Sequence, residues 1–133
     1  MKHFSRKLVT IFMLIIWQSS LGTNAALKDF SNVTTKSLSQ NGYYKLPDGL
    51  MIQWGVSTGS FNKYVYLNTS FYDSNYNLIL TSVVPGDSLT SIMIVNKFTS
   101  YFICRSRYIG TNMSEGIITC NDPFNWFAIG RWK

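Results

Sequence analysis

The feature that most limits the fold is a series of short β-type runs, rich in Val, Ile, Thr, Tyr and Phe, separated by turn residues. One turn, Pro47-Asp48-Gly49, lies between two apolar runs and is a strong hairpin signal, because Pro fixes φ and Gly tolerates a positive φ. Such short, regularly punctuated runs predict an all-β chain, an antiparallel sandwich or barrel of seven to eight strands. The predicted strands are Tyr43–Leu46, Leu50–Trp54, Tyr64–Ser70, Leu78–Val84, Ser91–Asn96, Ser100–Arg107, Gly116–Thr119 and Asn125–Arg131.

The first part of the chain has a different pattern. Residues 1–7 are basic, residues 8–17 are almost entirely apolar, and small or polar residues follow to Ala26. This is the layout of a secretory signal peptide, so residues 1–25 are predicted to be a signal-like N-terminal helix that export would remove. A ten-residue helix rises about 15 Å, about half the hydrocarbon core, so no stable membrane span is expected. The alternative is a buried strand or helix.

Residues 26–40 are rich in Ser, Thr, Asn and Lys and lack a regular apolar period. We interpret them as a linker, with Asn41-Gly42 opening the folded domain that continues to residue 133. The chain has 12 Lys and Arg against six acids, but Lys2, Arg6 and Lys7 belong to the leader. The remaining excess of bases is too small for a nucleic-acid binder, so no nucleic-acid partner is expected.

The residues that most enzymes require are scarce. His3 is the single histidine and lies in the leader, which excludes a His-based triad or a Cys/His zinc site from the folded part. The six carboxylates lie mostly in predicted turns, where such residues bond to their own backbone. No pair suits glycoside hydrolysis, and no nucleophile elbow or phosphate-binding glycine loop is present. The sequence therefore predicts a protein that is not an enzyme, with no catalytic residues, metal or cofactor.

Two cysteines lie symmetrically about Asn112. A hairpin centred near residues 111 and 112 would bring Cys104 and Cys120 opposite each other, within disulfide range. In an oxidising compartment, closing a loop of about 15 residues would contribute about 3 kcal/mol. The alternative is a pair of buried free thiols, and the sequence leaves both open.

Aromatic residues are more numerous than a core of this size can hide. The chain has four Trp, eight Tyr and nine Phe, of which three precede residue 26. Aromatic area with nearby Asn, Asp or Ser suits carbohydrate, and it also suits a protein interface. The segment 71–77 combines these residues at one predicted hairpin tip, and we nominate Tyr72, Asp73, Asn75 and Tyr76 as contacts to a partner. The alternative is that Phe71 and Tyr76 pack inward.

Two longer motifs resemble a known family. The segment NGYYKLPDGLMIQWG, residues 41–55, is similar to the N-G-[YW]-x-K-L-P-x-G-L-[IM]-[IL]-Q-W-G opening of phage tail-fibre C-terminal domains. The segment FNWFAIG, residues 124–130, resembles their closing F-x-W-x-A-I-G. Residues 64–71 and 97–106 lie where the family places strands, and residues 21–29 resemble its linkers. The resemblance covers about two-thirds of the chain, over residues 41–133.

The resemblance implies a β-sandwich at the distal end of a virion tail fibre, usually a homotrimer, that recognises a glycan or protein on the host surface. Trp54, Phe124 and Trp126 belong to the two motifs, and we interpret them as residues of fold and assembly. The sequence departs from the family at Asn68, where a Pro is common, and in its signal-like leader. The alternative function is therefore an exported periplasmic or secreted module that binds carbohydrate or protein, derived from the same type of domain.

Overall fold

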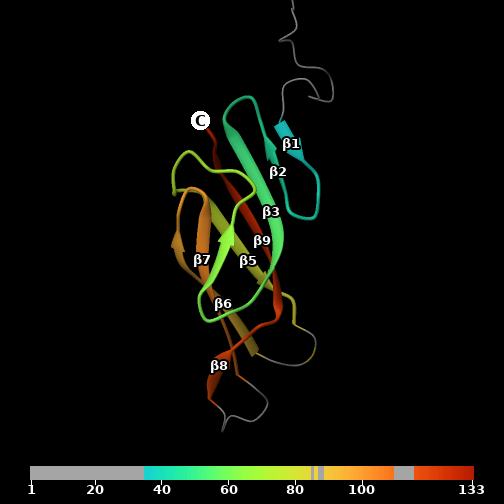
Figure 1. The fold of residues 1–133 in the computed structure, drawn as a ribbon, viewed down its shortest axis with the longest axis vertical. Helices are drawn as coiled ribbons and strands as arrows, with labels where there is room; N and C mark the ends of the chain where they lie inside the picture. The colour runs from blue at the N-terminus through green and yellow to red at the C-terminus, as the bar shows by residue number, and fades with distance from the viewer. Residues whose placement is uncertain (1–34, 85, 87–88, 110–115) are drawn as a thin grey trace, which may run out of the picture. The chain divides into compact units, whose positions relative to one another are not determined.

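The computed structural model describes residues 35–84, 86, 89–109 and 116–133, and these residues form nine strands with antiparallel pairing throughout (Figure 1). Each of the eight predicted runs contains a strand, so the all-β prediction is confirmed. The strands are β1 Thr35–Ser37, β2 Gly42–Lys45, β3 Leu50–Thr58, β4 Lys63–Tyr66, β5 Asn77–Ser82, β6 Leu89–Lys97, β7 Tyr101–Ile109, β8 Ile117–Thr119 and β9 Pro123–Arg131.

The strands form two sheets. The first has five strands in the order β1-β2-β3-β9-β5, and the second contains β4-β7-β6, with β8 paired to β7. The long β3–β9 pair joins residues 50–55 of the first family-like motif to the second motif, and it runs from Leu50 opposite Arg131 to Thr58 opposite Pro123. The two motifs, which are far apart in sequence, therefore lie side by side in the centre of one sheet (Figure 1).

The core lies between the two sheets. Phe124, Trp126 and Ala128 project inward from β9, and Trp126 meets Phe102 of β7 edge-on, with ring centroids 5.8 Å apart. Trp54 is different: it is half-buried on the outer face, and its indole nitrogen donates to the carbonyl of Ser39 at 3.0 Å. The motif tryptophans thus have two roles, one in the core and one in covering the sheet from outside.

The inward face of β3 carries Met51, Gln53 and Gly55, all buried. The outer face carries the apolar set of Leu50, Ile52 and Trp54, which is exposed or half-buried. Gly55 is required because an added Cβ would lie 2.6 Å from the Trp126 ring. Close packing of the two motifs therefore depends on a residue without a side chain at this position.

One strand lies where a linker was expected. Thr35–Ser37 pairs with β2, placing Thr35 opposite Lys45, so the fold begins inside the segment 26–40. A three-residue edge strand depends on the hydrogen-bonding edge of its neighbour, and no apolar period marks it in sequence. The predicted leader, residues 1–25, and its helix lie outside the described residues. Among the residues that are described, no helix is long and apolar enough to cross a membrane.

Candidate functional site

The nominated segment 71–77 is a surface loop tied to the end of β9. Tyr72 is 63% exposed, and the guanidinium of Arg131 lies 4.9 Å from the centre of its ring. Asp73 accepts a hydrogen bond from the backbone N–H of Asn75 at 2.8 Å and pairs with Arg131 at 3.4 Å. The Asn75 N–H, followed by the Arg131 charge, lowers the pKa of Asp73. The carboxylate of Asp73 and the ring of Tyr72 thus both contact Arg131, which ties the loop to the end of β9.

Tyr76 is not available to a partner, contrary to its nomination. It is 1% exposed and stacks on Phe71 with ring centroids 4.3 Å apart. Its hydroxyl donates to the carbonyl of Phe98 at 3.1 Å, and burial raises its pKa to about 12. The inward-packing alternative therefore describes Phe71 and Tyr76, and it leaves Tyr72, Asp73 and Asn75 on the surface.

The cysteines do not face each other. The β7–β8 register places Arg107 opposite Thr119, and the N–H of Cys120 donates to the carbonyl of Ser106 at 3.1 Å. This register centres the β7–β8 pairing one residue later than predicted, so the two cysteines are not opposite each other. The residue opposite Cys104 is Lys63 of β4, which also pairs with β7. Both thiols are buried and free, and burial raises the pKa of Cys104 to about 11. The structure favours the second alternative, two separate thiols.

A buried amide that the sequence analysis did not single out connects β3 to the segment that follows β4. Gln53 is fully buried; its Nε2 donates to the carbonyl of Thr69 at 2.8 Å, and its Oε1 accepts the Thr69 N–H at 3.1 Å. These two bonds fix the segment that follows β4. The sequence offers one signal for this contact: Gln53 is a polar residue that alternates with Met51 and Gly55 on the inward face. A buried polar group needs hydrogen-bond partners, so such a residue points to a specific contact.

Exposed aromatic rings gather over β4 and β7. Tyr66 is 73% exposed and Tyr64 is 53% exposed, on the side of β4 that faces away from the core. Tyr101 lies between them, with centroids 5.7 Å from Tyr66 and 5.9 Å from Tyr64, and Phe98 stacks on Tyr101 at 4.4 Å. We call these four residues the tyrosine platform.

Beside this platform is a polar crevice of about 250 Å³, which we call the β3–β4 crevice. The crevice exists because β2 pairs with β3 only as far as Gly42 opposite Trp54. The last residues of β3, Gly55–Thr58, therefore have no partner strand on the side where β2 lies. The other wall is β4, an edge strand of the second sheet. The surface of the crevice is mainly polar, and its lining residues are Asn41, Val56, Ser57, Lys63, Tyr64, Val65, Tyr66, Asn68 and Trp126.

A larger groove of about 550 Å³ crosses β6, β7 and β8. It is mainly apolar, with Leu89, Met93, Ile109 and Ile117 among its lining residues. The guanidinium groups of Arg105 and Arg107 lie 4.3 and 4.4 Å from the centre of the Phe61 ring. Arg105 donates to Asn62 at 2.9 Å and Arg107 to Thr119 at 3.0 Å, so both cations are already engaged.

The carboxylates of the described residues each have a structural partner. Asp48 accepts a hydrogen bond from the N–H of Leu50 at 3.0 Å, and Asp122 accepts one from the thiol of Cys120 at 3.3 Å. Asp73 accepts the Asn75 N–H in the loop described above. Within these residues, no three His, Cys, Asp or Glu side chains gather as metal ligands would. The arrangement offers surfaces for binding, namely aromatic rings and hydrogen-bonding groups.

Comparison with known proteins identifies the fold's family. The family model for the C-terminal domain of gp53-like tail fiber proteins matches residues 45–131, from the end of β2 to the end of β9. The chain belongs to this tail-fibre C-terminal family. The match spans both motifs and most of the strands, and the family is typically structural, which is consistent with a protein that is not an enzyme. No curated protein matches the chain.

Two solved structures share the fold. One is the C-terminal part of the R2 pyocin fiber of P. aeruginosa, with a TM-score of 0.55 and 19% identity over 74% of this chain. The other is an N-truncated R2-type pyocin tail fiber, with a TM-score of 0.53 and 19% identity over 74% of this chain. The aligned part covers 26% and 37% of those chains, respectively. The tail-fibre domain is thus comparable to a minor part of each fibre.

Proposed function

We propose that this tail-fibre domain is a non-enzymatic tip that recognises a glycan or protein on the surface of a bacterial host. The observation that carries the proposal is the contrast between two sets of aromatic residues. The motif residues Phe124 and Trp126 are buried and serve the fold, whereas Tyr64 and Tyr66 are exposed beside a polar crevice. Exposed tyrosines supply large contact area at low entropy cost, which is why they are common in binding surfaces.

The charge of the chain is compatible with an anionic bacterial partner. Outside the leader, the chain has nine Lys and Arg against six Asp and Glu, a modest formal excess of +3. A positive surface attracts anionic polymers at long range and speeds encounter at low ionic strength. The surface of a bacterial cell, which presents acidic sugars and phosphates, is such a partner.

The experiment that tests the proposal is binding of the fluorescently labelled full chain to a panel of bacterial strains, followed by flow cytometry. We expect saturable binding to a subset of strains, with competition by unlabelled protein. Binding to none of the strains, or equal and unsaturable binding to all of them, would contradict receptor recognition. Periodate or protease treatment of the bound strains then distinguishes a glycan receptor from a protein receptor.

We further propose that the domain works as a homotrimer in a virion tail, with the outer face of the first sheet between subunits. Trp54, Phe127 and Ile79 lie in one row across β3, β9 and β5, because Phe127 is opposite both of the others. Ile79 is 60% exposed and Phe127 is 37% exposed, so the row is an uncovered apolar stripe. A stripe of this kind marks an interaction surface.

Native mass spectrometry tests this assembly. We expect a trimer for the wild type and a shift toward monomer for Phe127→Asp, which places a charge in the stripe. Asn125→Asp adds the same charge two residues away on the same face, outside the row, and should leave the trimer intact. A monomeric wild type, or equal behaviour of the two variants, would contradict the assignment of this face.

A further inference from the structure

We infer that the β3–β4 crevice binds one acidic sugar residue, a pyranose that carries a carboxylate. This inference rests on the proposed function, since it takes the receptor to be a glycan, and it specifies both the ligand class and the place. At about 250 Å³ the crevice is smaller than a typical pocket for a drug-sized ligand, about 300–1,000 Å³. It is therefore suited to a single ring, with the rest of the glycan outside.

Some of the hydrogen-bonding groups that line the crevice have no partner among the described residues, which suits sugar hydroxyls. Asn41 uses its Oδ1 to accept the N–H of Val56 at 2.8 Å, and Asn68 uses its Nδ2 to donate to the carbonyl of Gly42 at 2.8 Å. The remaining polar atoms are Asn41 Nδ2, Asn68 Oδ1, Ser57 Oγ and Lys63 Nζ; none of them bonds to another described residue. Both donors and acceptors are thus held in place with capacity left for a ligand.

The orientation of the two asparagines is fixed by these same bonds. Asn41 caps the unpaired part of β3, and Asn68 joins the segment after β4 to the start of β2. The Gln53 bonds to Thr69 hold that segment next to Asn68. A few polar groups set rigidly around a concavity are the usual means of orienting a small ligand.

Aromatic rings on the outer side of β4, next to the crevice, offer apolar contact to the sugar ring. Tyr64 and Tyr66 line the crevice and are also members of the tyrosine platform. The C–H face of a pyranose is apolar and packs on the face of an aromatic ring, while its hydroxyls bond at the edge. Because Tyr101 contacts both tyrosines and itself stacks on Phe98, the rings are pre-arranged at little entropy cost.

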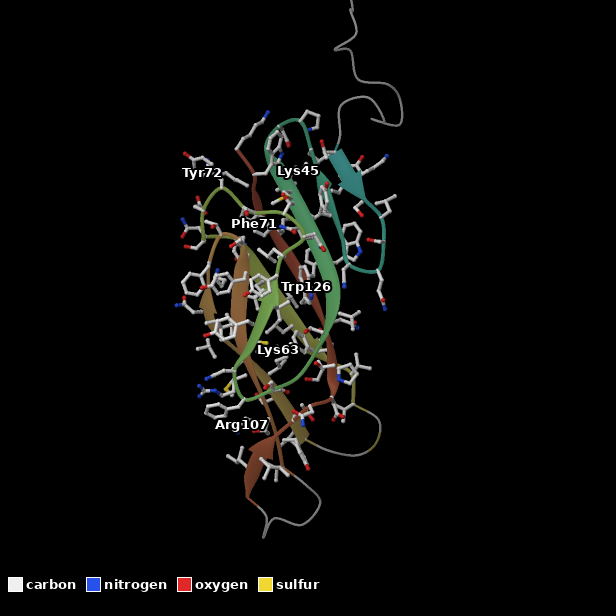
Figure 2. All side chains as sticks on the ribbon, viewed as in Figure 1. Lys45, Lys63, Phe71, Tyr72, Arg107 and Trp126 are labelled. Carbon is white, nitrogen blue, oxygen red and sulfur yellow. The ribbon has the colours of Figure 1, made fainter. Side chains whose placement is uncertain are left out.

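The charge of Lys63 selects the class of sugar. Lys63 alternates with Tyr64 along β4, so it lies on the same side of the strand as buried Val65, and it is one of the residues that line the crevice. No carboxylate lines the crevice. An ammonium group with no described partner favours an anion, and a charge-assisted bond to a carboxylate is about twice as strong as a neutral one. Figure 2 shows Lys63 and Trp126 toward the middle of the domain, away from Tyr72.

The larger groove over β6, β7 and β8 does not compete for this ligand. Its lining is mainly aliphatic, and its two arginines already donate to Asn62 and Thr119. Its neutral polar side chains are Ser91 and Tyr108, and it has no asparagine amides of the kind that Asn41 and Asn68 supply in the β3–β4 crevice.

The test is an NMR titration of the isotope-labelled full chain with glucuronate and, as the matched neutral probe, glucose. We expect glucuronate to bind about tenfold more tightly, with shifts concentrated at Asn41, Val56 and Lys63–Asn68. Lys63→Gln should remove the preference, so that the two sugars bind alike. Val56→Asp should weaken the binding of glucuronate and leave that of glucose unchanged, because it adds a negative charge to the wall and keeps the backbone N–H that bonds to Asn41.

Three results would overturn the inference: equal affinity of the wild type for the two sugars, a preference that survives in Lys63→Gln, or shifts confined to the Tyr72 loop. Cell binding measured on the same samples separates this failure from that of the proposed function. If cells are bound but the sugars are not distinguished, the crevice assignment fails alone. If no strain is bound, the proposed function fails as well.

Discussion

Replacement of Gln53 by Leu tests how the fold holds the segment beside the crevice. The substitution keeps the volume of a buried side chain but removes both hydrogen bonds to Thr69. Each bond has a net value of about 0.5–1.5 kcal/mol, and each backbone group left unpaired inside the protein costs about 1–3 kcal/mol. Thr69 is half-buried, so water can partly replace the lost hydrogen bonds. The total loss of stability should therefore be smaller than the sum of the individual costs.

We therefore expect Gln53→Leu to lower the free energy of unfolding by about 2–4 kcal/mol, a large fraction of the about 5–15 kcal/mol typical of a domain. Urea unfolding at one fixed protein concentration, followed by tryptophan fluorescence, measures the change. Thr69→Ala is the matched control: the bonds involve the backbone of Thr69, so its side chain should matter little. A loss below about 0.5 kcal/mol for Gln53→Leu, or an equal loss for the control, would refute the reasoning.

Further predictions concern packing, pH and thiol chemistry. Gly55→Ala should destabilise the domain by about 1–3 kcal/mol in thermal unfolding, because the new Cβ would lie 2.6 Å from the Trp126 ring; unchanged stability would contradict this packing. Folding raises the pKa of Cys104 from 9.0 to about 11 and that of Tyr76 from 10.0 to about 12, so the stability that depends on their neutral forms is fully present below pH 9. The free energy of unfolding should therefore fall as pH rises from 9 to about 12, and it should fall less steeply between pH 9 and 11 in Cys104→Ala. Equal urea midpoints from about pH 8 to 11 would contradict this prediction. A thiol reagent should detect two thiols per chain in urea without reductant and react slowly in the native state; no thiols would indicate a disulfide.

Most of the strands could be predicted because their signals are local. Alternation of β-type residues between explicit turns depends only on neighbours in sequence, and each of the eight predicted runs contains a strand. The edge strand at Thr35–Ser37 could not be found in this way, since its stability comes from pairing with β2 rather than from its own residues. The length of β4 was overestimated: Leu67–Ser70 leaves the sheet and is fixed by Gln53 instead.

The site was harder to predict because it depends on how the two sheets meet. Tyr76 and Tyr72 lie in the same seven-residue segment, yet Tyr76 is buried against Phe71 and Tyr72 is exposed. The choice is made by the neighbouring sheet, which offers the carbonyl of Phe98 to one hydroxyl. The β3–β4 crevice brings Asn41, Lys63 and Asn68 together from three separate segments, and no spacing in the chain encodes that meeting.

The cysteine register shows the same limit at a smaller scale. Symmetry about Asn112 predicted that Cys104 and Cys120 would lie opposite each other, but a shift of one residue in the centre of the hairpin places Ser106 opposite Cys120. Strand registers are set by side-chain pairing and by the turn, and equal distances from a presumed centre do not specify either.

The central claim, that the surface beside β4 recognises the host, is tested most directly by titrating three labelled full-length proteins onto cells of a bound strain. The account predicts that Tyr72→Ala binds like the wild type and that Tyr66→Ala binds about tenfold more weakly, as the loss of one aromatic contact implies. Unchanged binding by Tyr66→Ala together with loss of binding by Tyr72→Ala would contradict the account and assign recognition to the loop.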